Sequence, residues 1–326
     1  MKISTMMLSS MIFLASSHPV ISSQVKDENK QPTPTQLLDA LRGQPGLRAS
    51  HPKGFFAEGT FLPDKNVSQF IKGNFFQHDT LPAVFRFSIG GNNPKVSDKS
   101  QIVRGLSVHI SDDSEHYNLV LSSEPVFFAS TPRSVLSFQN ARAPDPITHQ
   151  VDPKKMTLHL KKYPEAQTLL TLLASHPAPS SYATSRYYSN HAFGFKGENN
   201  TLTWARIILR PRADVHYLTK EQEKTLPDNF LEHEMKQRLS KGDIVFDVYA
   251  QRAEKKDSLS DPSQLWKGKN EVKLGELHVN KISKPGLYDT LVFFPLQLPK
   301  NIQGADDPIL NIRGAVYRES FSRRKP

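Results

Sequence analysis

The sequence predicts an α+β protein in which a large, mostly antiparallel β-sheet or barrel carries helices at its periphery. Three observations support this fold class. Many short segments alternate apolar and polar residues with period two, Gly, Pro and Asn separate them, and fewer segments show helical periodicity. No repeat of 20 to 50 residues recurs, and no 18-residue apolar run follows the N-terminal segment, which disfavours solenoids and membrane spans.

Each element is placed by its own pattern. In the first strand, Phe55, Ala57, Gly59 and Phe61 fall on one face. The expected strands are 55–61, 83–89, 106–110, parts of 117–128, 191–196, 201–209, 244–250, 274–280 and 289–294. The expected helices are 35–42, 132–142, 164–175, 228–239 and 313–324.

Composition limits the chemistry. The 326 residues contain no cysteine, which excludes disulfides, thiol catalysis, Fe–S clusters and Cys-zinc sites. The formal net charge is +10, a value that also suits nucleic-acid or anionic-membrane binding. The basic residues are mostly scattered singly without an interleaved aromatic platform, so we predict no nucleic-acid partner. We interpret the charge as solubility and as attraction for anionic ligands.

The N-terminus is typical of an export signal. Residues 1–23 hold one early Lys, a short apolar run and then small residues, and residues 24–34 would follow as a flexible polar arm. We therefore predict a signal peptide at 1–23, one domain at 35–326 and a periplasmic or secreted location. An uncleaved interfacial anchor is the alternative.

The C-terminal segment carries the first candidate site. On a helix, positions i, i+4 and i+11 return to one face, so Arg313, Tyr317 and Arg324 would point at one neighbour. A phenol ionises only near pH 10, and a ferric iron beside a guanidinium is one environment that stabilises the phenolate. The spacing favours a haem iron ligand at Tyr317. A solvated basic face on an amphipathic helix is the alternative.

Two further constellations lie near the start of the predicted domain. His51 is followed at once by Pro52 and soon by Gly54, so it is held at a bend, where a histidine can face a cavity. Arg86 and Ser88 share one face of a strand whose other face is apolar, and that polar face is suited to line a pocket. The alternatives are that His51 is an exposed loop residue without a function and that Arg86 faces solvent at the edge of the sheet.

A fourth stretch runs from Asn118 to Phe138. The pair Phe127 and Phe128 is suited to wall a flat apolar ligand, although ordinary core packing explains these rings equally well.

In this order, the segments resemble the catalase family, and the chain length is similar to its minimal branch, the exported catalase-related peroxidases. The resemblance runs from about residue 35 to the end. The matching positions are Arg48, His51, Lys53 and Gly54; Val84, Arg86, Phe87 and Ser88; Arg104 and Gly105; Pro125 to Phe128; Asp307 to Leu310; and Arg313, Tyr317 and Arg324.

The resemblance implies a haem b site in a β-barrel core. His51 would be the distal general base and Ser88 its hydrogen-bond partner, while Tyr317 would be the proximal iron ligand with Arg313 beside it. The implied propionate ligands are Arg48, Arg86 and Arg324, and Phe128 and Phe138 would contact the cofactor.

One position departs from the family pattern and bears on the reaction. True catalases have an asparagine where this chain has Ser122, after a glycine that is Leu121 here. A serine hydroxyl is shorter than the amide and positions peroxide less firmly. The chain also ends soon after Tyr317, from which we expect a more open haem edge.

The resemblance therefore implies a peroxidase that reduces peroxide through a ferryl intermediate. Its partners would be hydrogen peroxide or an organic peroxide and an external donor, either a small molecule or a redox protein. A weak catalase, a non-catalytic haem-binding protein and an envelope polyanion-binding module are the alternatives. The resemblance is compatible with a homo-oligomer.

Overall fold

Ten β-strands form one antiparallel sheet, and eight of them close into a barrel. The computed structural model describes residues 30–324, and the predicted signal peptide lies outside them. Pairing between β7 and β8 closes a ring of eight strands, in the order β7, β5, β4, β3, β2, β1, β9 and β8, while β6 and β10 extend from β7. The strands are β1 (Gly54–Pro63), β2 (Leu81–Ile89), β3 (Arg104–Ser111), β4 (His116–Ser122), β5 (Tyr187–Tyr188), β6 (Phe193–Lys196), β7 (Leu202–Pro211), β8 (Ile244–Arg252), β9 (Glu271–Ile282) and β10 (Ile302–Gly304).

The barrel interior is filled by the apolar side chains that alternate along its strands. Phe85 and Phe87 of β2 are fully buried, and Phe87 lies opposite Phe55 on β1 and Leu106 on β3. Since neighbours in register point to the same face of a sheet, this row faces the core. The residues between them, among them Arg86, therefore face outward. The alternation predicted for this strand is confirmed.

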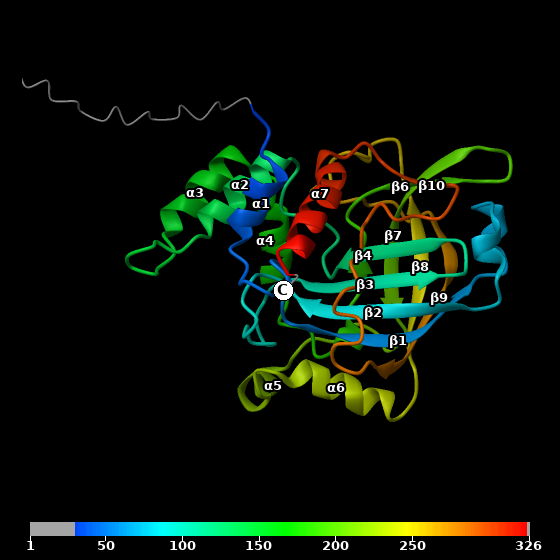
Figure 1. Cartoon of the computed structure of the whole chain (residues 1–326), viewed down its shortest axis with the longest axis horizontal. Coiled ribbons are helices and arrows are strands. Elements are labelled where there is room, and N and C mark those ends of the chain that lie inside the picture. Colours follow the sequence, from blue (N-terminus) through cyan, green and yellow to red (C-terminus); the bar gives the residue numbers. More distant parts are fainter. Residues whose placement is uncertain (1–29, 325–326) are drawn as a thin grey trace, which may run out of the picture. The chain divides into compact units, whose positions relative to one another are not determined.

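Helices cover the outside of the barrel. They are α1 (Pro34–Leu41), α2 (Pro132–Ala141), α3 (Pro153–Lys162), α4 (Ala166–Ala174), α5 (Lys220–Thr225), α6 (Phe230–Leu239) and α7 (Pro308–Ser322), with short 3-10 turns at Val67–Gln69, Asn74–Gln77 and Tyr182–Thr184. Helix α7 packs against α1 and α2, and α2 packs against α3 (Figure 1). Asp307 begins α7 by accepting two backbone N–H groups in its first turn.

Two predicted elements differ from the structure. Residues 289–294 do not form a strand, because their backbone groups bond within local turns and to side chains of other segments, including Asn118. The last helix begins at Pro308 and ends at Ser322, so it starts earlier and stops sooner than 313–324. Helices α3 and α5 and the short strands β5 and β10 were not predicted.

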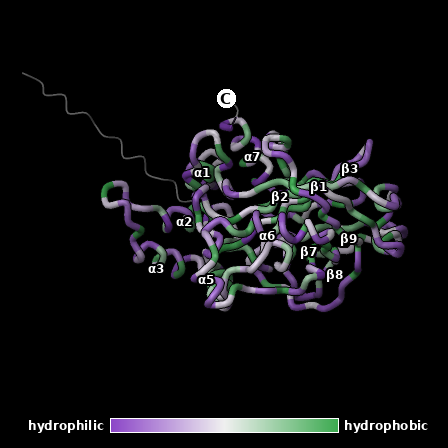
Figure 2. Tube along the Cα trace, turned by 90° about the horizontal axis from the view of Figure 1, so that it is seen from below, coloured by the Kyte–Doolittle hydropathy of each residue, from purple (hydrophilic) through white to green (hydrophobic). Residues whose placement is uncertain are grey.

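Hydrophilic residues predominate on α3 and on the segment before it, whereas the barrel strands alternate between the two classes (Figure 2). Within residues 30–324, no helix is long and apolar enough to cross a membrane.

Candidate active site

The site is built on a row of small residues across the outer face of four strands. Gly54, Ser88, Gly105 and Ser122 are consecutive partners on β1, β2, β3 and β4. A Cβ on Gly105 would lie 2.7 Å from the Ser88 Oγ and 2.9 Å from the His51 Nδ1. Only glycine fits at Gly105, because any larger residue would displace the imidazole.

His51 is held by both its backbone and its ring. Its φ of 55° lies in the left-handed region, which costs a non-glycine residue about 1 to 2 kcal/mol. The backbone N–H donates to the Gly91 carbonyl at 2.8 Å, and the Arg86 Nη2 donates to the His51 carbonyl at 2.8 Å. The predicted bend is confirmed, and the surrounding hydrogen bonds hold the strained conformation.

The ring hydrogen bond selects one tautomer. The Ser88 hydroxyl donates to the Gly105 carbonyl at 3.4 Å, so its oxygen accepts from the Nδ1–H of His51 at 3.1 Å. This assignment leaves the Nε2 lone pair free to accept a proton. Burial, with the nearby charges of Arg86 and Arg313, lowers the pKa of His51 to about 4. The imidazole is therefore neutral at pH 7.

Three arginines form a cluster beside this histidine. Burial lowers the pKa of Arg48 to about 9, helped by the charges of Arg86 and Arg324. Burial also lowers the pKa of Arg86 to about 10, and Arg324 contributes there as well. The pKa of Arg324 is lowered by burial too. The cluster therefore concentrates positive charge where little water screens it.

No carboxylate of residues 30–324 forms an ion pair with the three guanidiniums. The guanidiniums donate hydrogen bonds to backbone carbonyls, and Asp289 offsets their charge only through space. The buried Nε of Arg324 has no partner in the described part of the chain. Unpaired buried charge is costly, so the cluster is suited to a ligand that carries two carboxylates.

The second part of the site, Arg313 and Tyr317, is on α7. The Arg313 Nη2 donates to the Tyr317 Oη at 2.5 Å, one helical turn apart, as the spacing predicted. Arg324 lies beyond the last helical residue, so the predicted single helix face holds only for Arg313 and Tyr317. Arg324 still joins the cluster, because the chain after α7 brings its charge close to Arg48 and Arg86.

Sequence reasoning missed a buried hydrogen bond between a histidine and a carboxylate at the start of α7. His191 Nδ1 lies 2.6 Å from the Asp307 Oδ2, and both side chains are almost fully buried. Asp307 also caps α7, and the charge of Arg313 helps to lower the pKa of His191, after the larger effect of burial. The pair thus fixes the helix that carries Tyr317. Asp307 was in a recognised motif, but nothing in the sequence distinguishes His191 among 12 histidines.

The remaining predicted residues lie around this centre. Phe128 and Phe138 stack with their ring centroids 4.4 Å apart. Ser122 is half-buried at the end of the small-residue row. Leu121 points into the barrel core, so it does not crowd Ser122 on the outer face.

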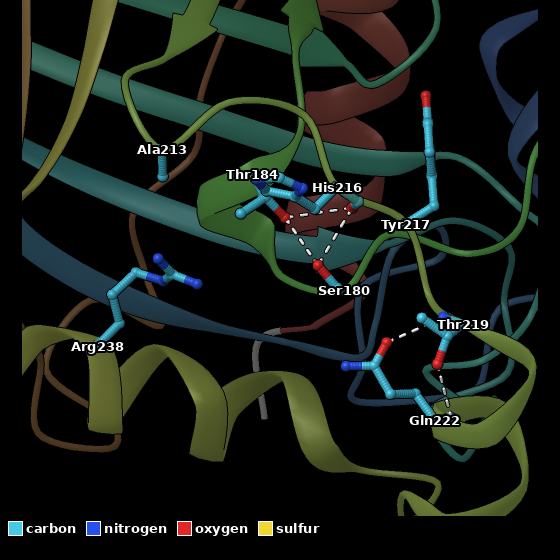
Figure 3. Close-up of a pocket in the computed structure, with 8 residues that line it drawn as sticks. All are labelled: Ser180, Thr184, Ala213, His216, Tyr217, Thr219, Gln222 and Arg238. Atoms are coloured by element: carbon cyan, nitrogen blue, oxygen red, sulfur yellow. Dashed lines mark hydrogen bonds between the residues drawn. The ribbon is translucent and has the colours of Figure 1, made fainter.

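A separate hollow of about 450 Å³ contains none of these residues (Figure 3). Ser180, Thr184 and the His216 carbonyl bond to one another there. Thr219 and Gln222 cap α5. These polar groups are committed to the fold, so the hollow offers few groups to a ligand.

The described residues hold no cluster of three His, Asp or Glu side chains that could bind a metal ion. A haem brings four of its own nitrogens, so it requires only one axial side chain and groups that bind its two carboxylates. Tyr317 beside Arg313, together with the unpaired arginine cluster, fits this requirement.

Comparison with known proteins agrees with this geometry. The catalase family profile matches residues 43–325. The chain belongs to the catalase family. Members of this family are typically haem enzymes that act on peroxide. The family assignment and the antiparallel barrel with helices, both predicted from the sequence, are confirmed.

Similar proteins include two catalase-related peroxidases. Those of Synechococcus elongatus and Mycolicibacterium paratuberculosis are each 31% identical over 300 residues, covering 90% of this chain and 88% and 95% of theirs. Catalase A of Saccharomyces cerevisiae superposes with a TM-score of 0.76 at 18% identity, over 87% of this chain and 62% of that one. A fungal catalase superposes with a TM-score of 0.77 at 19% identity, over 88% of this chain and 62% of that one. The chain thus spans less than two thirds of these larger catalases.

The neutral state of His51 predicts a pH dependence of stability. Its pKa is about 4 when folded and about 6.5 when unfolded, so the unfolded state binds more protons between these values. Stability should fall as the pH drops from 6.5 to 4, by at most about 3 kcal/mol from this group. Urea unfolding of the protein and of His51→Gln at pH 7 and pH 4 measures the contribution. Equal pH-dependent losses in both would show that His51 is not held neutral.

Proposed function

We propose that this protein is a haem-dependent peroxidase that reduces hydrogen peroxide, or an organic peroxide, with electrons from an external donor. The observation that carries the proposal is the unpaired arginine cluster close to a neutral histidine and to the Tyr317–Arg313 pair. Each part on its own has a structural explanation. Together they provide an axial ligand, a carboxylate-binding cluster and a base, which the catalase-related relatives support.

The residues would hold a haem b as follows. Tyr317 supplies the axial oxygen, and the Arg313 guanidinium stabilises negative charge on it. Arg48, Arg86 and Arg324 bind the two carboxylates, and Phe128 and Phe138 are proposed to flank the cofactor. When bound, the haem supplies the redox chemistry that cleaves the peroxide O–O bond.

His51 moves the proton in this proposal. Its Nε2 would accept a proton from one peroxide oxygen and return it to the other, which leaves as water. The Nδ1–H stays on the Ser88 Oγ throughout, which keeps the ring oriented. Two carboxylates at the arginine cluster would offset the charge of Arg86, which adds to the larger effect of burial in lowering the pKa of His51.

Ser122 supports reduction by a donor over dismutation. On the outer face of β4, it shares the small-residue row with Ser88 and offers one short hydroxyl where true catalases have an asparagine. A weak catalase remains the second candidate because His51 and Ser88 are both present. A non-catalytic haem carrier is disfavoured, since a carrier has no need for a strained histidine bonded to a serine.

We also propose that the enzyme acts outside the cytoplasm. The support is the sequence of residues 1–23, which has the features of a signal peptide. Fusing residues 1–34 to a reporter enzyme that is active only after export tests this proposal.

Tyr317→Phe should abolish stable haem retention or change the visible spectrum, because it removes the axial oxygen and leaves Arg313 without its acceptor. Tyr163→Phe is the control, since this half-buried tyrosine ends α3. Absorption spectra of the proteins purified with haem give the result. A parental spectrum in Tyr317→Phe would place the ligand elsewhere.

Ser122→Asn should raise oxygen evolution from hydrogen peroxide relative to donor oxidation. A rigid amide positions peroxide better than a hydroxyl, an effect worth up to about a hundredfold. Leu121 can stay in place because it lies in the core. Ser240→Asn, at the end of α6, is the control. An oxygen electrode and a donor assay give the two rates. An unchanged ratio would show that Ser122 does not limit dismutation.

A further inference from the structure

The segment between β9 and β10 (orange in Figure 1) forms an apolar groove with α7. This groove has a volume of about 560 Å³, within the range of small-molecule sites. It is lined by Leu287, Tyr288, Thr290, Leu291, Val292, Phe294, Gln297 and Phe321. None of these side chains is charged. Leu287 is 57% exposed, so the groove is open to solvent.

The same segment also contacts the arginine cluster. Its backbone carbonyls at Asp289 and Leu291 accept hydrogen bonds from Arg324 at 3.5 Å and from Arg48 at 3.0 Å. The segment thus contributes backbone carbonyls to the cluster and side chains to the groove. The groove therefore adjoins the candidate cofactor site at these residues.

Aromatic contacts also connect the groove to the arginine cluster. The ring of Tyr288, in the groove wall, lies 5.8 Å from the ring of Phe56. The guanidiniums of Arg48 and Arg86 lie 5.7 and 5.8 Å from that same Phe56 ring. A molecule in the groove would thus be connected to the arginine cluster through two packed rings.

We propose that this groove binds the reducing substrate, and that the substrate is a small, neutral aromatic compound of the phenol class. The inference rests on the proposed peroxidase function. The lining side chains are mainly aromatic and aliphatic, with Thr290 and Gln297 as the polar ones, and none is charged. Such walls favour an uncharged ring, which packs against Tyr288. The Phe321 ring at the groove is itself faced by the Arg324 guanidinium, 5.2 Å from its centroid. A redox protein would dock across an open surface of up to roughly 600 Å² on each partner, whereas a groove of about 560 Å³ has the size of a small-molecule site.

The electron balance is closed by the two substrates. Two phenol molecules each give up one electron and one proton and leave as phenoxyl radicals. The peroxide takes up these two electrons and two protons, its O–O bond breaks, and two waters form.

The test uses 2-methoxyphenol as the aromatic donor and ferrocyanide as a hydrophilic, anionic one. Leu287→Glu places a carboxylate at the groove and is tolerated by the fold, since the side chain is exposed. Leu158→Glu is the matched control, because Leu158 is 66% exposed on α3. Binding of 2-methoxyphenol to the full protein without peroxide is measured by saturation-transfer NMR, and steady-state kinetics follow with both donors.

We expect Leu287→Glu to weaken 2-methoxyphenol binding at least tenfold. The ratio of kcat/KM for 2-methoxyphenol to that for ferrocyanide should fall by a similar factor, chiefly through KM. Leu158→Glu should match the parent in both measurements. Parental binding and an unchanged ratio in Leu287→Glu would overturn the groove assignment, as would oxidation of ferrocyanide without any 2-methoxyphenol binding. A parent that oxidises neither donor would instead contradict the proposed peroxidase function.

Discussion

The arrangement of the candidate site depends on positive charge that the described residues do not neutralise. Arg48, Arg86 and Arg324 come from three distant parts of the sequence. After the larger effect of burial, the charges of Arg86 and Arg324 lower the pKa of Arg48, and the charge of Arg324 lowers the pKa of Arg86. The barrel supplies Arg86 from a rigid strand, while carbonyls of the 289–291 segment hold the other two. Such a cluster opposes folding unless another interaction offsets it. A bound dianion would be that interaction.

The same charge controls the base. Arg86 holds the backbone of His51 in a left-handed bend and, by its charge, helps to keep the imidazole neutral. An anionic cofactor would offset this charge and so stabilise the fold. The N-terminus of helix α7 is held by Asp307, whose carboxylate caps the helix and contacts His191. The helix that carries Tyr317 and Arg313 is therefore anchored by buried contacts as well.

Much of this could be predicted from the sequence, for reasons that particular residues illustrate. The alternation around Arg86 and Ser88 reflects a strand with one core face, and the i, i+4 spacing of Arg313 and Tyr317 reflects one helical turn. Both are local patterns. The 289–294 segment was predicted wrongly because its run of β-branched and aromatic residues suits a strand, whereas no strand edge pairs with it.

Long-range pairing accounts for what the sequence could not reveal. The bond between His191 and Asp307 joins residues 116 positions apart, and no spacing rule connects them. The apolar groove likewise joins the 287–297 segment to Phe321 of α7. The steric reason for Gly105 appears only when His51 and Ser88 are seen against it.

The central claim is that the arginine cluster binds the two carboxylates of a haem. The most direct test titrates the haem-free protein with haem and with its dimethyl ester, in which both carboxylates are neutral. Charge-assisted hydrogen bonds contribute roughly 1.5 to 3 kcal/mol each, so two of them predict an affinity for haem at least about a hundredfold higher than for the ester. Equal affinities would contradict the account, because the cluster would then have no role in binding the cofactor.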